Sequence, residues 1–125
     1  VWHDLPILGP RSEDAARVAI AAGNQGAYLP VHRHLMRNVL RPGPAGLTRL
    51  ASEFGLDAGR LRADIAAPET ARRIETAHAA AAVLGIAGTP ALVVGRTVVI
   101  GLTGKQSLIE LIGIERQLQV QNRFC

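Results

Sequence analysis

The segment Gly88-Thr89-Pro90-Ala91 most constrains the fold of this chain, because it joins an alanine-rich stretch to a run of β-branched residues. Proline fixes its own φ and donates no backbone hydrogen bond. It also disfavours the helical conformation at the preceding residue, Thr89. The sequence therefore predicts that a helix ends before this segment and that a strand begins at Ala91. An X-Pro bond is also the common place for a cis peptide.

Hydrophobic periodicity and turn residues predict the other elements. A strand over residues 91–94, a tight turn at Gly95-Arg96 and a return strand over residues 97–100 form a predicted hairpin. Ser12 is the expected N-cap of the first helix, and Asp57 is that of the fourth. Helices are expected over residues 12–22, 28–38, 47–54, 57–65, 68–84 and 105–118, and an opening strand over residues 1–5. This order predicts a mostly helical α/β fold, whose small sheet combines the opening strand with the C-terminal hairpin.

Composition excludes several classes of function. A chain of 125 residues with 48% hydrophobic residues is long enough for one packed domain. No run of eighteen apolar residues is present, so no membrane span is expected. The net charge of +4 is carried almost entirely by scattered arginines, without aromatic residues between them. That pattern predicts solvated helix faces rather than a nucleic-acid-binding surface.

Histidines and carboxylates do not form a predicted metal or catalytic site, and no cofactor is expected. His32 and His34 are two residues apart, so on a helix they point to different sides. His78 is expected to be a partly buried structural histidine. Trp2 is expected in the core, and Asp4 is expected to serve the exit of the opening strand.

Several of these segments resemble the DsbA-type thiol:disulfide oxidoreductases, which have a thioredoxin fold with a helical insert. Residues 4–10, followed by Ser12 and Ala15-Ala16, are similar to that family's strand exit and first helix. Residues 84–95 are similar to its cis-proline segment. The resemblance covers Val1 to about Ile112. It implies one incomplete thioredoxin-like domain over residues 1–125, with a helical insert over about 12–66 and a cis-proline, hairpin and helix segment over about 68–118.

The chain departs from that family at the redox centre. Family members begin with a strand, a Cys-x-x-Cys motif and the helix that follows it, and none of these is present, so we expect a truncated form. Thiol exchange needs an activated thiolate and a partner thiol. The single cysteine, Cys125, matches neither family cysteine. We therefore expect no catalytic residue and no dithiol exchange. Cys125 is either an unpaired tail thiol or the site of an intermolecular disulfide.

The resemblance implies that Gly88, Thr89 and Pro90 bind unfolded or cysteine-containing protein substrates in an extracytoplasmic, periplasmic compartment. The missing strand would lie in the middle of the sheet and leave two edges exposed. Either the two remaining parts close directly on each other or a second copy supplies the pairing, and we expect a homodimer or a higher oligomer. The alternative is a non-catalytic peptide-binding or assembly module. A third possibility lies with glutathione-linked relatives, the kappa-class transferases and chromene-carboxylate isomerases. These usually carry Val-Pro followed by a hydroxyl or aromatic residue, so Thr89-Pro90-Ala91 favours the disulfide branch.

Overall fold

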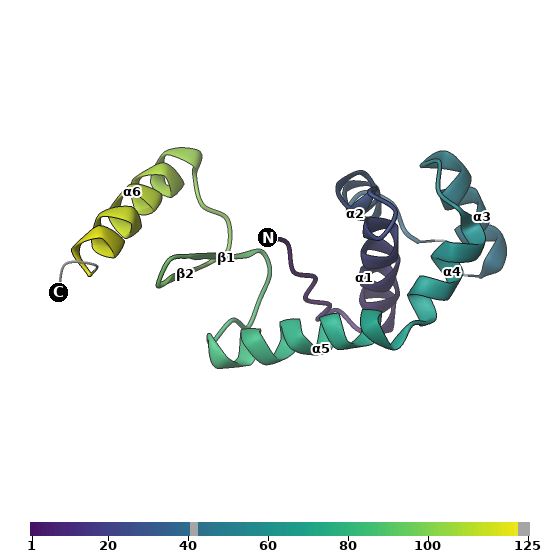
Figure 1. Cartoon of the computed structure of the whole chain (residues 1–125), viewed down its shortest axis with the longest axis horizontal. Coiled ribbons are helices and arrows are strands. Elements are labelled where there is room, and N and C mark those ends of the chain that lie inside the picture. Colours follow the sequence, from purple (N-terminus) through teal and green to yellow (C-terminus); the bar gives the residue numbers. More distant parts are fainter. Residues whose placement is uncertain (41–42, 123–125) are drawn as a thin grey trace. The chain divides into compact units, whose positions relative to one another are not determined.

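Five helices precede a β-hairpin and a sixth follows it in this computed structural model, which describes residues 1–40 and 43–122 (Figure 1). The elements are α1 (Pro10–Gly23), α2 (Tyr28–Leu35), α3 (Pro44–Glu53), α4 (Ala58–Ala66), α5 (Pro68–Val83), β1 (Ala91–Val94), β2 (Thr97–Ile100) and α6 (Lys105–Gln121). The chain divides into two compact units, Val1–Ala79 and Ala80–Cys125. Among the described residues, no helix combines the length and the apolar character that crossing a membrane requires.

Local signals explain where the helices begin and end. The side chain of Asp57 caps α4 as predicted, since Oδ1 accepts a hydrogen bond from the Arg60 backbone N–H at 2.6 Å. The end of α5 before Gly85 is also confirmed, and Gly85 takes the left-handed φ of 67° that glycine tolerates. The predicted cap at Ser12 is wrong. The helix α1 begins earlier, at Pro10, because proline is preorganised for the first helical position and Gly9 adopts a φ of 86° before it.

Small side chains build the core of the first unit. α1 packs against α2 and α4, and α3 packs against α4; Figure 1 shows α2 lying beside α1. Val18, Val31 and Leu61 are buried almost completely between these helices, together with Ala21 and Ala22. Alanine lets helix backbones approach closely, but it buries little apolar area, so each contact contributes little stabilisation.

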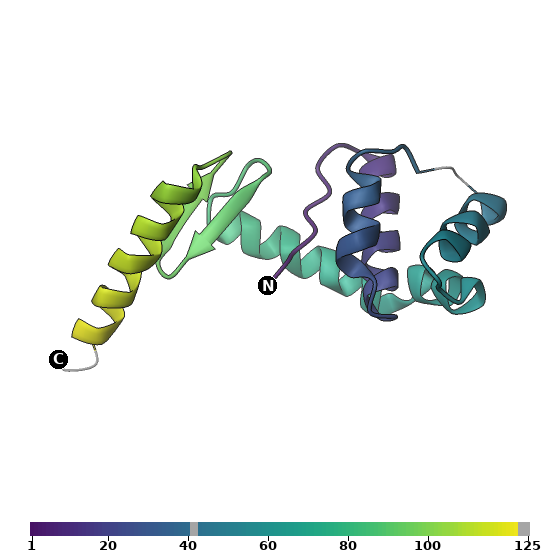
Figure 2. The ribbon, with the colours of Figure 1, turned by 90° about the horizontal axis from the view of Figure 1, so that it is seen from above.

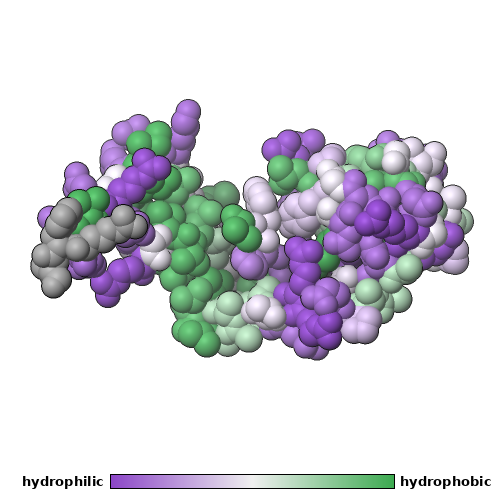
Figure 3. Space-filling model, in the orientation of Figure 1, coloured by the Kyte–Doolittle hydropathy of each residue, from purple (hydrophilic) through white to green (hydrophobic). Residues whose placement is uncertain are grey.

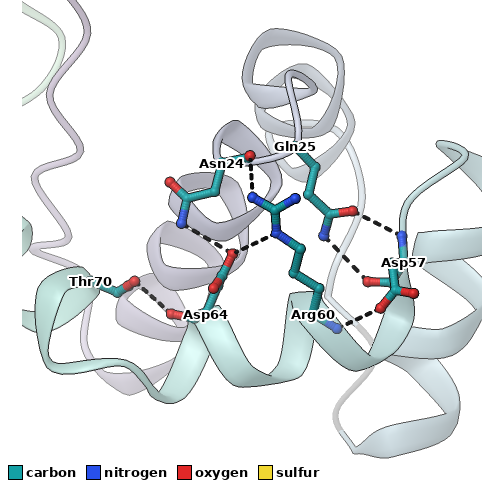
Figure 4. Close-up of polar contacts among 6 residues, drawn as sticks. All are labelled: Asn24, Gln25, Asp57, Arg60, Asp64 and Thr70. Carbon is teal, nitrogen blue, oxygen red and sulfur yellow. Dashed lines mark hydrogen bonds and ion pairs between the residues drawn. The ribbon is translucent and has the colours of Figure 1, made fainter.

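A polar network joins the turn after α1 to α4 (Figure 4). The Gln25 side chain accepts from the Asp57 N–H at 2.9 Å and donates to the Asp57 carbonyl at 3.3 Å. The Arg60 guanidinium donates to the Asn24 carbonyl at 3.0 Å, and the Asn24 amide donates to Asp64 at 3.2 Å. These bonds fix the register of α4 against α1, which apolar contacts between alanines define only weakly.

In the second unit, β1 and β2 form the predicted antiparallel hairpin, with α6 alongside (Figure 2). The register pairs Ala91 with Ile100 and Val94 with Thr97, so Gly95 and Arg96 form the two-residue turn. The closing helix α6 continues to Gln121, beyond the predicted end at residue 118.

The side chain of Glu115 fastens α6 to the hairpin turn. It is only 5% exposed, and its two oxygens accept hydrogen bonds from the Arg96 N–H at 3.0 Å and the Thr97 hydroxyl at 2.6 Å. The bond from Thr97, followed by that from Arg96, lowers the pKa of the Glu115 carboxyl. Gly95 has a φ of 58°, and a Cβ at this position would overlap the Glu115 carboxylate, 2.7 Å from Cδ. Both the backbone conformation and the available space therefore require glycine here.

The predicted opening strand over residues 1–5 is wrong. Residues 1–9 form no strand, and the sheet of the described residues consists of β1 and β2 alone. The opening segment is held instead by side-chain contacts between Asp4 and α2, which replace backbone pairing. Two other boundaries differ from expectation: α2 ends at Leu35 rather than residue 38, and α3 begins at Pro44 rather than residue 47.

Candidate functional site

The loop Gly88–Pro90 connects the end of α5 to β1, as the sequence predicted. Its Thr89–Pro90 peptide bond is cis. Thr89 and Pro90 are exposed, and Gly88 is half-buried. The Pro90 carbonyl accepts a hydrogen bond from the Gly101 N–H at 2.8 Å, which ties the loop to the base of the hairpin. The loop is therefore held at a defined position although its side chains face solvent.

The backbone of this loop and of β1 has unused hydrogen-bonding capacity. Within the described ranges, no hydrogen bond engages the N–H or the carbonyl of Thr89. Residues of an antiparallel strand alternate between facing their partner strand and facing away. Because Pro90 bonds to Gly101 across the hairpin, Leu92 and Val94 also face β2, and Ala91 and Val93 face outward. We call the outward backbone groups of Ala91 and Val93 the β1 edge.

The surroundings of the β1 edge are apolar and uncharged. Leu92 is 37% exposed, Val93 53% and Ile100 56%. Figure 3 shows hydrophobic residues gathered over the hairpin. No charged residue occurs from Gly88 to Gly95. This arrangement can bind an extended polypeptide through backbone hydrogen bonds, and it offers no acid, base or nucleophile for chemistry.

A second cluster, in the first unit, is formed by Trp2, Asp4, Tyr28 and His32. The Tyr28 hydroxyl lies 3.0 Å from both carboxylate oxygens of Asp4, and Nδ1 of His32 lies 3.6 Å from Oδ1. The His32 ring stacks on Tyr28 at a centroid distance of 5.4 Å, and Trp2 packs against it at 5.7 Å with a tilt of 48°. We call this group the Asp4 cluster. It anchors the opening segment to α2.

Burial dominates the electrostatics of the Asp4 cluster. Desolvation raises the pKa of the Asp4 carboxyl, while the hydrogen bond from Tyr28 and the charges of His32, Arg73 and His3 oppose that rise. Desolvation, together with the neighbouring Asp4 carboxylate, raises the pKa of the Tyr28 hydroxyl. Tyr28 is thus a persistent hydrogen-bond donor. Sequence analysis missed this cluster. The spacing of Tyr28 and His32, one helical turn apart, was the signal for a shared face.

The histidines of α2 contact separate carboxylates. His32 approaches Asp4, whereas Nδ1 of His34 lies 3.4 Å from Oε1 of Glu53 and its ring meets Phe54 edge-on. Among residues 1–40 and 43–122, no group of three or more histidine, cysteine or acidic side chains is placed to hold a metal ion.

Three predicted placements are wrong, and one lies outside the described residues. Trp2 is 61% exposed rather than in the core, because its segment rests on the surface of α2. Asp4 pairs with Tyr28 rather than serving a strand exit. His78 is exposed, because the buried side of α5 follows Ile74, Ala77 and Ala81. Cys125 falls beyond residue 122.

Comparison with known proteins places these features in context. Residues 3–113 match the family model of the DSBA-like thioredoxin domain. A solved thioredoxin-like oxidoreductase from Silicibacter pomeroyi DSS-3 is 38% identical with a TM-score of 0.81, over 94% of this chain and 68% of that one. The thiol-disulfide exchange protein alpha-DsbA2 from Wolbachia pipientis is 23% identical with a TM-score of 0.77, over 90% and 63%, and supports the fold alone.

Curated relatives of a different kind also match. A stretch of 92 residues, 72% of this chain, is 36% identical to the Na(+)/H(+) antiporter NhaA 3 of Salinispora tropica and 35% identical to the Na(+)/H(+) antiporter NhaA 1 of Salinispora arenicola. The match covers only 14% of each antiporter, so this chain spans a small part of the length of those relatives.

Proposed function

Since this chain belongs to the family of DSBA-like thioredoxin domains, we propose that it binds extended polypeptide at the loop Gly88–Pro90 and performs no dithiol exchange by itself. The predicted fold class is confirmed: the chain has the thioredoxin-like DsbA fold, mostly helical, with a small antiparallel sheet. The prediction of one incomplete domain, with its insert over about 12–66 and its C-terminal segment over about 68–118, stays part of this proposal.

The observation that carries the peptide-binding proposal is the unpaired backbone of Thr89. An exposed N–H and carbonyl at the start of a strand can pair with an incoming extended chain. Thiol chemistry needs two sulfur atoms that react in sequence, and the chain has one cysteine. Binding without exchange is therefore the activity that the residues of this chain support best.

The proposed partners are cysteine-containing or unfolded polypeptides, on which the DsbA family generally acts. An extracytoplasmic compartment, which is typical of the family, belongs to the same proposal. Self-association into a homodimer remains a prediction that light scattering in solution can test.

The test of binding uses fluorescence anisotropy with a labelled, reduced and carboxymethylated polypeptide as the probe. Thr89→Pro removes the N–H of residue 89, so we expect at least tenfold weaker binding. Thr89→Ala is the matched control, because it keeps the N–H and should bind within twofold of the parent chain. Circular dichroism verifies that both variants remain folded. Equal affinity of the parent chain and Thr89→Pro would contradict the proposal.

The test of exchange is the reduction of insulin disulfides by dithiothreitol, followed by turbidity. We expect the rate with this chain to equal the uncatalysed rate, and Cys125→Ser to leave it unchanged. A rate well above the uncatalysed reaction that disappears in Cys125→Ser would overturn the claim that this chain has no exchange activity.

A non-catalytic assembly module is the second candidate function. It is favoured by the match to two proteins named as antiporters, in which the similar stretch is a small part of a much longer chain. An assembly module should bind one partner tightly and discriminate between unfolded polypeptides. Similar affinities for several unrelated carboxymethylated proteins would favour the general peptide-binding function instead.

A further inference from the structure

We propose that Glu115 is a positioning residue for the loop Gly88–Pro90: by holding the hairpin turn on α6, it sets the direction in which the loop backbone presents its hydrogen-bonding groups. This inference rests on the proposed peptide-binding function and names a residue that controls the affinity of that site from the other end of the hairpin. It follows from the attachments of the hairpin to α6, which lie within the second unit.

Hydrogen bonds join the loop to the base of the hairpin. The Pro90 carbonyl accepts from the Gly101 N–H at 2.8 Å, directly beyond the pair of Ala91 with Ile100 that ends the register. Thr89 precedes this bond by one residue. A rotation of the hairpin therefore turns the N–H and the carbonyl of Thr89 with it.

The hairpin is attached to α6 at both of its ends. At the base, residues 101–104 connect β2 to the first turn of α6. At the turn, the Glu115 carboxylate accepts from the Arg96 N–H at 3.0 Å and from the Thr97 hydroxyl at 2.6 Å. The helix rises about 15 Å between Lys105 and Glu115, and a strand of four residues spans about 13 Å. The two attachments are therefore nearly a full hairpin length apart.

The attachment at the turn restricts tilting of the hairpin more than the base does. The base contains Gly101, with a φ of 89°, and Gly104, and glycine has the widest backbone freedom. The helix α6 also packs against β1, but within the described residues no hydrogen bond joins these two elements, and non-directional packing tolerates a tilt. Hydrogen bonds weaken steeply as their angle departs from linearity. A tilted hairpin should therefore bind a backbone partner at Thr89 less tightly.

The burial of Glu115 indicates that its carboxylate supplies direction as well as packing. An apolar side chain would cover the hairpin without the free-energy cost of removing a carboxylate from water. The carboxylate adds two oxygens, and each accepts from a separate donor of the turn. Gly95 leaves the space that this arrangement occupies.

The first experiment measures binding of the labelled, reduced and carboxymethylated polypeptide by fluorescence anisotropy. Glu115→Ala removes both acceptors, so we expect about fivefold to tenfold weaker binding. Glu115→Gln keeps one acceptor oxygen and should bind within threefold of the parent chain. Glu110→Ala is the matched control, because Glu110 is an exposed carboxylate of the same helix that accepts from Gln106 rather than from the hairpin. It should change binding less than twofold.

Thr97→Val distinguishes positioning from a general loss of stability, because it removes one donor to Glu115 and keeps a β-branched side chain. In the parent chain it should weaken binding about threefold. In the Glu115→Ala background it should have almost no effect, because the acceptor is already absent. Equal effects in the two backgrounds would contradict the proposal. Circular dichroism verifies that each variant is folded.

Amide chemical shifts of the chain without polypeptide supply a readout at the loop itself. Thr97→Val and Glu115→Gln should each shift the amide signals of Thr89 and Gly101, at the opposite end of the hairpin, whereas Glu110→Ala should not. Unchanged signals at both positions would overturn the proposal even if Glu115→Ala failed to fold.

The outcomes separate this inference from the proposed function. If Thr89→Pro abolishes binding while Glu115→Ala and Thr97→Val bind like the parent chain, the loop binds polypeptide and Glu115 does not position it. If the parent chain does not bind the polypeptide, the proposed function is wrong. The amide signals of Thr89 and Gly101 then decide by themselves whether Glu115 positions the loop.

Discussion

Removing the Tyr28 hydroxyl tests how strongly the Asp4 cluster holds the opening segment. Tyr28→Phe deletes the donor that lies 3.0 Å from both Asp4 oxygens and keeps the ring that stacks on His32. The Asp4 side chain is only 10% exposed, so water compensates little for the lost bond. A hydrogen bond to a charged group contributes about 1.5–3 kcal/mol. We expect a loss near the lower end, because Nδ1 of His32 still lies 3.6 Å from Asp4.

The effect of Tyr28→Phe should depend on pH with a defined sign. Burial raises the pKa of the Asp4 carboxyl in the folded state above its value in the unfolded chain. The protein therefore loses stability as the pH rises through the pKa of the folded state, where Asp4 becomes ionised. Asp4→Asn should remove this loss, because asparagine does not ionise. The bond from Tyr28 acts in the opposite direction, because it favours the ionised carboxyl. Its contribution is therefore largest at neutral pH. It should fall to roughly 1 kcal/mol in acid, where both groups are neutral.

Urea unfolding of the parent chain, Tyr28→Phe, Asp4→Ala and the double variant measures this coupling as a double-mutant cycle, because Asp4→Ala removes the acceptor, whereas Asp4→Asn keeps one. Trp2 is the only tryptophan and packs on His32, so its fluorescence reports on the cluster, while circular dichroism reports on the helices. A coupling energy below about 0.5 kcal/mol at pH 7, unchanged at pH 4, would refute the reasoning, since charge-assisted bonds exceed that value.

Three further predictions address other parts of the structure. Leu61→Ala should lower the free energy of unfolding by about 2–5 kcal/mol, because Leu61 is fully buried; a loss under about 1 kcal/mol in urea titration would show that the core is loose. Asp57→Ala should cost about 1 kcal/mol by removing the cap of α4, and Asp57→Asn should cost much less; equal losses would rule out capping as the cause. Gly95→Ala should displace Glu115 and speed hydrogen exchange at the Arg96 amide, and exchange at the parent rate would contradict the overlap.

Sequence patterns predicted those elements that depend on neighbouring residues. The hairpin was predicted at its observed bounds, because four β-branched or apolar residues on each side of Gly95-Arg96 leave few alternatives. The cap at Asp57 and the end of α5 before Gly85 were predicted for the same reason, because each depends only on residues that are neighbours in the sequence. Two neighbouring positions could have started α1, namely Pro10 after Gly9 and the residue after Ser12. The helix begins at Pro10.

Features that depend on distant residues were not predictable in this way. A strand over residues 1–5 requires a pairing partner, which periodicity does not reveal, and the segment is held by Tyr28 and His32 instead. The exposure of Trp2 follows from the same contact. The loop Gly88–Pro90 was located from its residue types, but the outward direction of Ala91 and Val93 required the register of the hairpin.

The contact between Gly95 and Glu115 has a consequence for how this fold can change over evolutionary time. A side chain added at residue 95 would overlap the Glu115 carboxylate, and this carboxylate cannot move without losing its hydrogen bonds from the Arg96 N–H and the Thr97 hydroxyl. A shortened side chain at residue 115 opens the space but leaves those donors to solvent. The two positions should therefore covary in related sequences. A hairpin grafted from another protein should seat on α6 only when its turn brings the matching glycine.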